Sequence, residues 1–331
     1  GISAGFLADS NENLYAGTSS GEDSSTNTCF NIGIGYSAGA NLNGNFACYN
    51  VLMGHKAGNA ITIGGNNIAI GCDAAALMTE GACNIAIGKQ ALGKCTVTAS
   101  SNIAIGCLAG QQITSGNTNI FIGNAAGYQS TDAYLNLFIG DAAGGYVSGN
   151  ANRNIALGHC AGYRMTTGRF NIMLGNCTAK DGLLSGDDNI IFGRQAGLNV
   201  SSGSSNISLG RSAGCAINTG SYNILFGDCA GKQITTGRHN VVMGKDAMSS
   251  GGGQGADCNV TLGFAAGCLI SFGSRNILLG ACAGKTTSSG ANNIAIGYNV
   301  TLPSATGDCQ LAIGNDTDRW IAGDSSFNVT L

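Results

Sequence analysis

The sequence predicts an all-β fold, a β-solenoid or β-roll of about 18 coils, each coil being one 17-residue repeat. An Asn recurs along the 331 residues at intervals of 17, 18 or 19, mostly 17. An aliphatic residue always follows this Asn, and a Gly always stands four residues after it. Such a fixed period is typical of repeat architectures, in which each repeat packs only on its neighbours.

The clearest copy runs from Asn223 to His239 and reads N-I-L-F-G-D-C-A-G-K-Q-I-T-T-G-R-H; its general form is N-I-x-Φ-G-x-x-A-G, where Φ is apolar. With Asn as position 1, the apolar positions 2 and 4 alternate with 3 and 5, which indicates a short strand ended by Gly. The A-G at positions 8 and 9 indicates a corner, and a second short strand carries position 12 inward. The T-G near positions 14 and 15 turns the chain back. Two strands and two turns therefore form one coil.

The repeated Asn is expected to have a structural role. Coils that stack at the strand spacing of about 4.8 Å place identical residues above one another. A column of Asn side chains then forms an amide ladder, in which each side chain bonds the next. The predicted ladder includes Asn67, Asn84, Asn102, Asn119, Asn154, Asn171, Asn206, Asn223 and Asn240.

The middle residue of the predicted strand suggests that one chain is not enough. Position 3 points away from the face that carries positions 2 and 4, yet it is apolar in most copies, as at Leu52, Phe121 and Phe138. A strand that is apolar on both faces is buried on both faces. One face can pack inside the coil, and the other is an apolar strip along the array that needs a partner. We therefore expect a homo-oligomer, with a parallel homotrimeric fibre as the favoured arrangement.

The repeats divide the chain into two regions. Residues 1–314 form one continuous array, and residues 315–331 form a divergent last coil or a junction to a further C-terminal region. The first five residues, Gly1 to Gly5, match repeat positions 5 to 9. We therefore expect that the chain begins in mid-coil and is a segment of a longer protein.

Composition argues against most other classes of function. Charged residues make up 10%, the formal net charge is −3 and no basic patch stands out, so nucleic acid is not an expected partner. No apolar run approaches 18 residues, so no membrane partner is expected either. No C-x-x-C pair and no Ser-His-Asp or paired-carboxylate cluster occurs, so we expect no enzyme, no cofactor and no metal.

Fourteen cysteines are spread over different repeat positions. Only Cys160 and Cys177 are expected to share a slot in adjacent coils, which would bring their Cα atoms within disulfide range. The other cysteines are expected to be small, corner-filling thiols, which suits assembly in a reducing compartment.

Three tyrosines form the one candidate binding feature of the turns. Tyr128, Tyr146 and Tyr163 are placed at position 10 of successive coils. Stacked rings would give either a structural column or a platform for a glycan, because sugars pack on aromatic faces. The pattern leaves both alternatives open.

The array N-I-A-I-G-x-x-A-G and the tail from Gln310 to Val329, with its G-D-S-S-F-N-V, resemble the repeat regions of tail-fibre and other appendage proteins of marine tailed phages, notably cyanophages, and of some large algal viruses. N-I-A-I-G is more remotely similar to the head repeats of trimeric autotransporter adhesins. The resemblance implies a virion location, other virion or fibre proteins as partners, and a shaft that positions a receptor-binding tip for host attachment. The alternative is a cell-surface adhesin or extracellular filament that binds host glycans through its turns.

Overall fold

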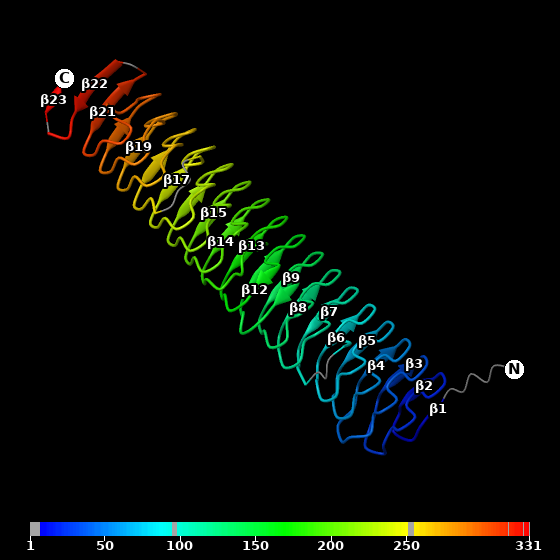
Figure 1. The fold of residues 1–331 in the computed structure, drawn as a ribbon. Helices are drawn as coiled ribbons and strands as arrows, with labels where there is room; N and C mark the ends of the chain where they lie inside the picture. The colour runs from blue at the N-terminus through cyan, green and yellow to red at the C-terminus, as the bar shows by residue number, and fades with distance from the viewer. Residues whose placement is uncertain (1–6, 95–97, 251–254, 317, 327, 331) are drawn as a thin grey trace. The chain divides into compact units, whose positions relative to one another are not determined.

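The computed structural model describes residues 7–94, 98–250, 255–316, 318–326 and 328–330 (Figure 1). Over these ranges the regular secondary structure is β-strand, without helix. The chain divides into two compact units, with the boundary between Thr167 and Gly168. The expected repeat match of Gly1 to Gly5 lies outside the described residues.

The first unit contains twelve strands within its described part, all of them three residues long or shorter. They are β1 (Leu7–Ala8), β2 (Leu14–Ala16), β3 (Ile32–Ile34), β4 (Val51–Met53), β5 (Ile68–Ile70), β6 (Ile85–Ile87), β7 (Ile103–Ile105), β8 (Ile120–Ile122), β9 (Leu137–Ile139), β10 (Tyr146–Val147), β11 (Ile155–Leu157) and β12 (Arg164–Met165).

The second unit repeats the pattern and ends in longer strands. They are β13 (Ile172–Leu174), β14 (Ile190–Phe192), β15 (Ile207–Leu209), β16 (Ile224–Phe226), β17 (Val241–Met243), β18 (Val260–Leu262), β19 (Ile277–Leu279), β20 (Ile294–Ile296), β21 (Leu311–Asn315), β22 (Asp318–Gly323) and β23 (Val329–Thr330).

The strands of successive coils pair in parallel and in register within each unit. In the first unit Ile85 pairs with Ile103, and in the second Ile207 pairs with Ile224. Equivalent residues of the repeat therefore lie beside one another, because each coil advances the chain by one strand. The predicted parallel β-solenoid with a 17-residue repeat is confirmed.

The expected second strand of each coil is mostly absent. In the described residues only β10 and β12 form such a strand, in which Val147 pairs with Met165. Position 12 still points inward, since Ile61, Ile113 and Val200 are fully buried. The segment reaches the core through turns and bends, and isolated backbone hydrogen bonds such as Thr114 N to Thr131 O (2.9 Å) join it to the next coil.

The structure decides which sheet face packs inside the coil. Position 3 lies in the core, where Leu52, Phe121 and Phe138 have no exposed surface, and positions 2 and 4 face outward. The cause is the narrow interior. The corner glycine approaches the strand so closely that a Cβ on Gly58 would lie 2.6 Å from the Leu52 side chain. Each strand can therefore place one side chain inside, and Phe121 and Phe138 stack there with ring centroids 5.5 Å apart.

The parallel pattern ends at both extremes of the described chain. β1 pairs with β2 in an antiparallel hairpin at the start. At the other end β20 and β21 are the last parallel pair, and β22 folds back antiparallel on β21 with a register shift between Ile313 and Gly314. Residues after Asn315 thus leave the 17-residue repeat.

Candidate functional sites on the solenoid surface

The Asn side chains form a buried ladder within each unit. Asn223 donates from its backbone N–H (3.1 Å) and its Nδ2 (3.0 Å) to the Oδ1 of Asn206. Its second Nδ2 hydrogen goes to the Gly237 carbonyl at 2.8 Å, which closes its own coil. Its Oδ1 in turn accepts both bonds from Asn240. All four hydrogen-bonding positions of the amide are therefore used, so the side chain can be buried without cost.

The same pattern recurs at the other predicted ladder residues. In the first unit it joins Asn67, Asn84, Asn102 and Asn119 through consecutive pairs, and Asn154 donates to Asn136. In the second unit Asn206, Asn223 and Asn240 follow one another, and Asn171 accepts from Asn189.

Different side chains end the ladder. At the start, Asp9 accepts the Asn13 backbone N–H at 3.0 Å and the Asn13 Nδ2 at 2.8 Å. Burial raises the pKa of Asp9, but these hydrogen bonds and one from the Asn11 backbone outweigh it and hold the pKa below its ordinary value. At the far end Gln310 takes the Asn place, and its Oε1 accepts the Ser304 N–H at 2.7 Å.

The outer face of the sheet is apolar in every coil. Positions 2 and 4 carry only Ile, Val, Leu, Met or Phe from residue 32 to residue 313. Many of these side chains are more than one-third exposed, including Ile34, Met53, Ile70, Phe192, Ile224 and Phe226. Within each unit they form two adjacent apolar columns, because consecutive strands are in register.

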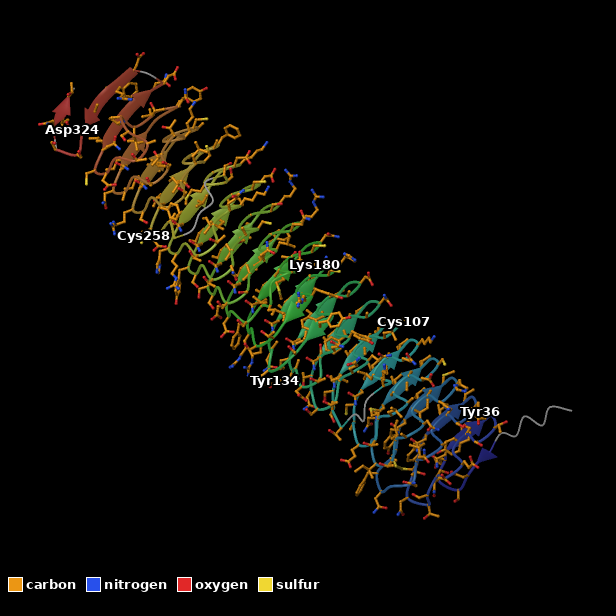
Figure 2. All side chains as sticks on the ribbon, viewed as in Figure 1. Tyr36, Cys107, Tyr134, Lys180, Cys258 and Asp324 are labelled. Atoms are coloured by element: carbon orange, nitrogen blue, oxygen red, sulfur yellow. A yellow bond between two sulfur atoms is a disulfide. The ribbon has the colours of Figure 1, made fainter. Side chains whose placement is uncertain are left out.

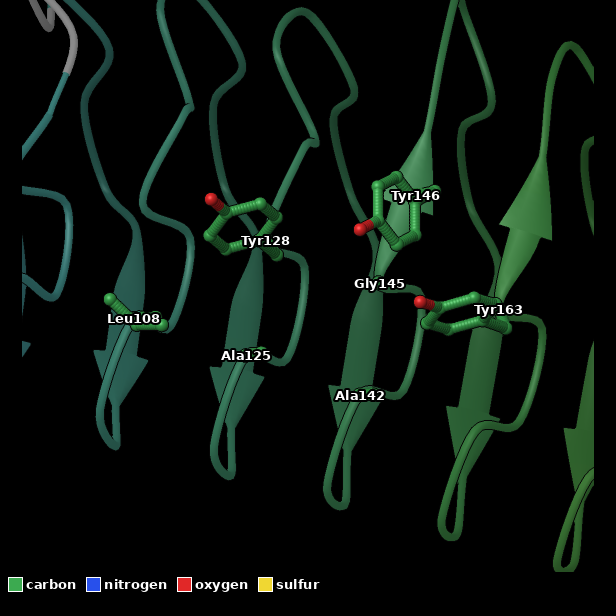
Figure 3. A pocket seen from close by; sticks show the side chains of 7 residues that line it. All are labelled: Leu108, Ala125, Tyr128, Ala142, Gly145, Tyr146 and Tyr163. Carbon is green, nitrogen blue, oxygen red and sulfur yellow. The ribbon is translucent and has the colours of Figure 1, made fainter.

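The three tyrosines form one cluster on the surface of the first unit (Figure 3). With Asn136 as position 1, Gly145 is at position 10 and Tyr146 is at position 11. The prediction that all three tyrosines occupy position 10 is therefore wrong. The rings meet edge to face, with centroids 6.2 Å apart for Tyr128 and Tyr146 and 4.9 Å for Tyr146 and Tyr163. They line a pocket of about 200 Å³ with Leu108, Ala125, Ala142 and Gly145.

Gly145 makes this ring arrangement possible. A Cβ at this residue would lie 2.7 Å from the Tyr163 ring, so a larger residue would push the ring out of this arrangement. Partial burial raises the pKa of the Tyr163 hydroxyl, and its contact with the Tyr146 hydroxyl raises it further. The cluster therefore presents ring edges and hydroxyl groups, whereas the sequence suggested rings stacked face to face.

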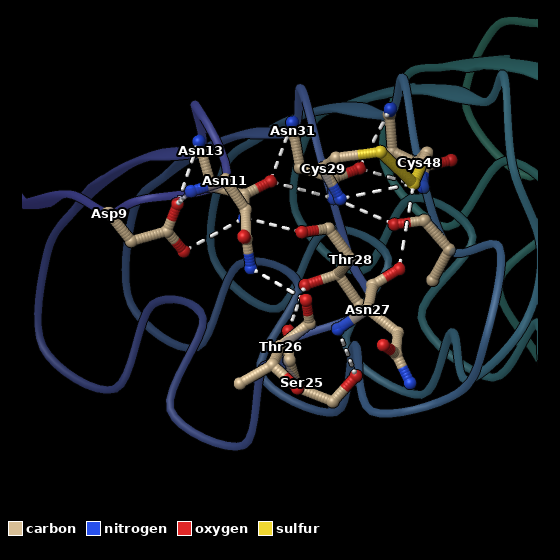
Figure 4. The surroundings of a disulfide bond; sticks show 12 residues. Asp9, Asn11, Asn13, Ser25, Thr26, Asn27, Thr28, Cys29, Asn31 and Cys48 are labelled. Atoms are coloured by element: carbon tan, nitrogen blue, oxygen red, sulfur yellow. Dashed lines mark hydrogen bonds between the residues drawn. A yellow bond between two sulfur atoms is a disulfide. The ribbon is translucent and has the colours of Figure 1, made fainter.

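A disulfide joins Cys29 and Cys48 in the first unit, with Cα atoms 4.7 Å apart (Figure 4). Both residues stand two places before a ladder Asn, in adjacent coils, so the statement that only Cys160 and Cys177 share a slot was wrong. The expectation of free thiols fails for this pair. The variable repeat length hides the match, because Cys29 is at position 17 after Asn13 whereas Cys48 is at position 18 after Asn31. Cys160 and Cys177 fall in different units, and the expectation that their Cα atoms lie within disulfide range stays a prediction.

In each coil a turn follows the Gly that ends the strand, and these turns form one edge of the first unit. Tyr36 and Cys107 lie on this edge in Figure 2, and Tyr134 lies on the opposite edge. On the former edge His55, Cys72 and Asp73 converge. His55 Nδ1 lies 3.7 Å from Asp73 Oδ1 and 4.0 Å from Cys72 Sγ, and Cys72 Sγ lies 3.6 Å from Asp73 Oδ2. Among the described residues this is the group of three whose ligand atoms all lie within 4.8 Å of one another.

Sequence reasoning missed this cluster, although a signal was present. His55 and Cys72 both occupy position 6 in adjacent coils, and Asp73 follows at position 7. A search for ligand residues along one coil cannot find them, because they come together only between coils.

Charged residues on the same edge of the second unit pair between coils. Arg211 donates from Nε (2.9 Å) and Nη2 (2.6 Å) to the two carboxylate oxygens of Asp228. The hydrogen bonds from Arg211 hold the pKa of Asp228 below its ordinary value. Both side chains remain accessible to water, so the pair is a modest stabilising contact.

The fold defines the class of the protein, which is a parallel β-solenoid of short repeats. No protein-family model matches the chain, and no curated protein matches its sequence significantly. No helical segment in the described part of the chain could cross a membrane.

Proposed function

We propose that this chain is the shaft of a viral appendage, a tail fibre whose copies associate side by side and hold a receptor-binding tip for host attachment. The resemblance of its repeat and its tail to phage and algal-virus appendage repeats supports a virion location. A solenoid supports the role of a shaft, because its ladders of backbone and Asn hydrogen bonds make each coil a template for the next.

The observation that carries the proposal is the apolar outer face. Single exposed aliphatic side chains are normal on protein surfaces, whereas contiguous apolar patches mark interaction sites. Phe226 is 51% exposed and Ile224 is 41% exposed, and they lie on one strand between similar neighbours. Full burial of an exposed side chain of this kind contributes about 1.5–3 kcal/mol. These side chains are already about half-buried, so each adds only part of that amount, and the interface is stable because the column is repeated.

A second copy of the same chain fits this face best. The outward side chains repeat at the strand spacing of about 4.8 Å, and only a surface with the same spacing can interdigitate with them over many coils. Three copies around a common axis would bury the face of each copy, so we propose a parallel homotrimer.

Analytical ultracentrifugation with a matched pair of variants tests self-association. Phe226→Lys places a charge on the outer face, and Tyr222→Lys places one on a turn with similar exposure (51% and 56%). We expect a mass near three times 33.1 kDa for the unaltered chain and for Tyr222→Lys, and a lower mass for Phe226→Lys. A monomer at micromolar concentration, or equal behaviour of the two variants, contradicts the proposed interface.

The location is tested separately by immunogold electron microscopy of the native source. Gold along fibres on virus particles supports the appendage. Gold on cell envelopes or free filaments overturns it and favours the second candidate, an adhesin or extracellular filament.

The second candidate draws on the tyrosine pocket. Tyr146 is 43% exposed and, with Tyr128 and Tyr163, offers aromatic surface beside hydroxyl groups, which is the chemistry that binds sugars. A glycan array probed with the unaltered chain and with Tyr146→Ala tests it. Tyr222→Ala is the control, because Tyr222 stacks on His239 in the second unit and does not line the pocket.

A further inference from the structure

The edge cluster of the first unit has the composition of a metal site. His55 offers an imidazole nitrogen, Cys72 a sulfur and Asp73 a carboxylate oxygen, and these are the three ligand types that zinc takes from proteins. The cluster lies apart from the outer face of the sheet, and it is independent of the proposed shaft function.

The backbone brings these ligands together. Gly54 and Gly71 end β4 and β5, and the position-6 residues that follow are stacked because the two strands pair in register. The Asp73 N–H donates to the His55 carbonyl at 2.9 Å, which joins the two turns directly. Asp73 has a φ of 54°, so the chain curls at this residue and its carboxylate returns toward His55.

The distances between the ligand atoms suit a tetrahedral ion. Zn–N bonds of about 2.0–2.1 Å and Zn–S bonds of about 2.3 Å place tetrahedral ligand atoms about 3.3–3.6 Å apart. His55 Nδ1 and Cys72 Sγ are 4.0 Å apart, Asp73 Oδ1 is 3.7 Å from His55 Nδ1, and the other carboxylate oxygen, Oδ2, is 3.6 Å from Cys72 Sγ. Binding requires the Asp73 carboxylate to turn so that one oxygen faces both partners, and the exposed side chains of His55 and Cys72 have room to adjust to it. Tyr36 stacks on the His55 ring at 5.3 Å and 14°, which restricts the imidazole orientation.

We propose that His55, Cys72 and Asp73 bind a divalent transition-metal ion of the zinc type, with water as the fourth ligand. Cys72 binds as the thiolate, and its proton goes to solvent when the metal enters. The ion joins the coil that begins at Asn50 to the coil that begins at Asn67.

A related group shows what the site requires. His159 Nε2 lies 3.4 Å from Asp141 Oδ2 and 3.5 Å from Cys160 Sγ, so the same three residue types meet again. Cys160 is buried, whereas Cys72 is exposed, and the ligand atoms of this second group do not all lie within 4.8 Å of one another. We therefore assign the metal to the first group alone.

Cobalt titration tests the proposal. The chain is reduced, stripped with a chelator and titrated with Co²⁺, which reports thiolate ligation by a charge-transfer band in the near ultraviolet. We expect one equivalent of Co²⁺ to produce this band and Zn²⁺ to displace it. Cys72→Ser should abolish the band and weaken binding by more than about tenfold, and Asp73→Asn should weaken binding while keeping the band.

Cys107→Ser is the matched control, because Cys107 is exposed at the same repeat position two coils later. It should bind like the unaltered chain. The proposal is overturned if no band forms, if Cys72→Ser keeps the band, or if Cys107→Ser loses it equally. Because His55 and Cys72 are exposed, the variants should fold, and their circular dichroism should match that of the unaltered chain.

Discussion

The amide of Asn223 donates to the Oδ1 of Asn206 at 3.0 Å, and the Asn223 backbone N–H reaches the same oxygen at 3.1 Å. One oxygen thus holds both the side chain and the main chain of the next coil. This arrangement makes the Asn a connector between coils, and it explains why the residue recurs with the period of the fold.

Replacement of Asn223 by Ala should destabilise the second unit. The Asn240 N–H and Nδ2 would lose the Asn223 Oδ1 as acceptor, and the Gly237 carbonyl would lose its donor, in a buried site, at a cost of about 1–3 kcal/mol for each unsatisfied group. Hydrogen exchange of the Ile224 and Asn240 amides measures the local loss. Asn218→Ala is the control, since Asn218 is exposed and bonds only at the surface. Equal exchange in the two variants would show that the ladder contributes no stability.

Replacement of Gly227 by Ala should prevent close stacking. Gly227 has a φ of +137°, and a Cβ there would lie 2.7 Å from the Gly244 carbonyl group of the next coil. The strained backbone alone costs about 1–3 kcal/mol, and the clash adds to it. Gly255→Ala separates the two effects, because Gly255 has a φ of +81° and no atom within 4 Å of the added Cβ. Thermal unfolding should show a larger drop for Gly227→Ala, and a similar drop would argue against the packing explanation.

The disulfide should stabilise the first coils. Cys29 and Cys48 close a loop across a sequence separation of 19, for which chain entropy predicts about 3 kcal/mol. Cys29→Ser should therefore increase proteolysis near residues 29–48 under oxidising conditions, and a reductant should have the same effect on the unaltered chain. Cys83→Ser should change neither result, because Cys83 is an exposed free thiol. Reductant-insensitive proteolysis of the unaltered chain would exclude a stabilising bond.

Asp9 should make the start of the array sensitive to acid. Its folded-state pKa lies below the ordinary value of 3.8, so the carboxylate stabilises the fold above that value. The contribution is lost as the pH falls through the lower folded-state pKa. Hydrogen exchange of the Asn13 amide should accelerate in that range. Asp9→Asn should remove this acid step and lower protection at neutral pH, and an unchanged acid step would assign it to another group.

Much of the fold can be predicted from the sequence because the same local pattern of residues occurs in every coil. The Asn period, the strand Gly and the corner A-G predict a parallel solenoid and an Asn ladder, and these features depend on contacts between identical positions. The second strand was overpredicted, since an inward apolar residue such as Ile113 requires only burial and not a continuous hydrogen-bonded strand.

The direction of each sheet face could not be predicted. Leu52 is at position 3 of one coil and Ile70 is at position 4 of the next, and both are aliphatic. Alternation along a strand shows only that these two positions point to opposite sides of the sheet. The coil interior decides, because the corner at Gly58 leaves room for the Leu52 side chain and directs Val51 and Met53 outward.

The sequence by itself determined the class of fold, the period and the role of Asn, because each depends on a pattern repeated in every coil. Only the tertiary structure decided which strand face is the core, and which side chains meet between neighbouring coils. Cys29 with Cys48, and His55 with Cys72 and Asp73, are separated by a coil of chain and become neighbours through stacking. The physical reason is that stacked coils place residues that are one coil apart in the sequence next to each other, at the strand spacing. The lengths of the turns decide which residues lie in the same column.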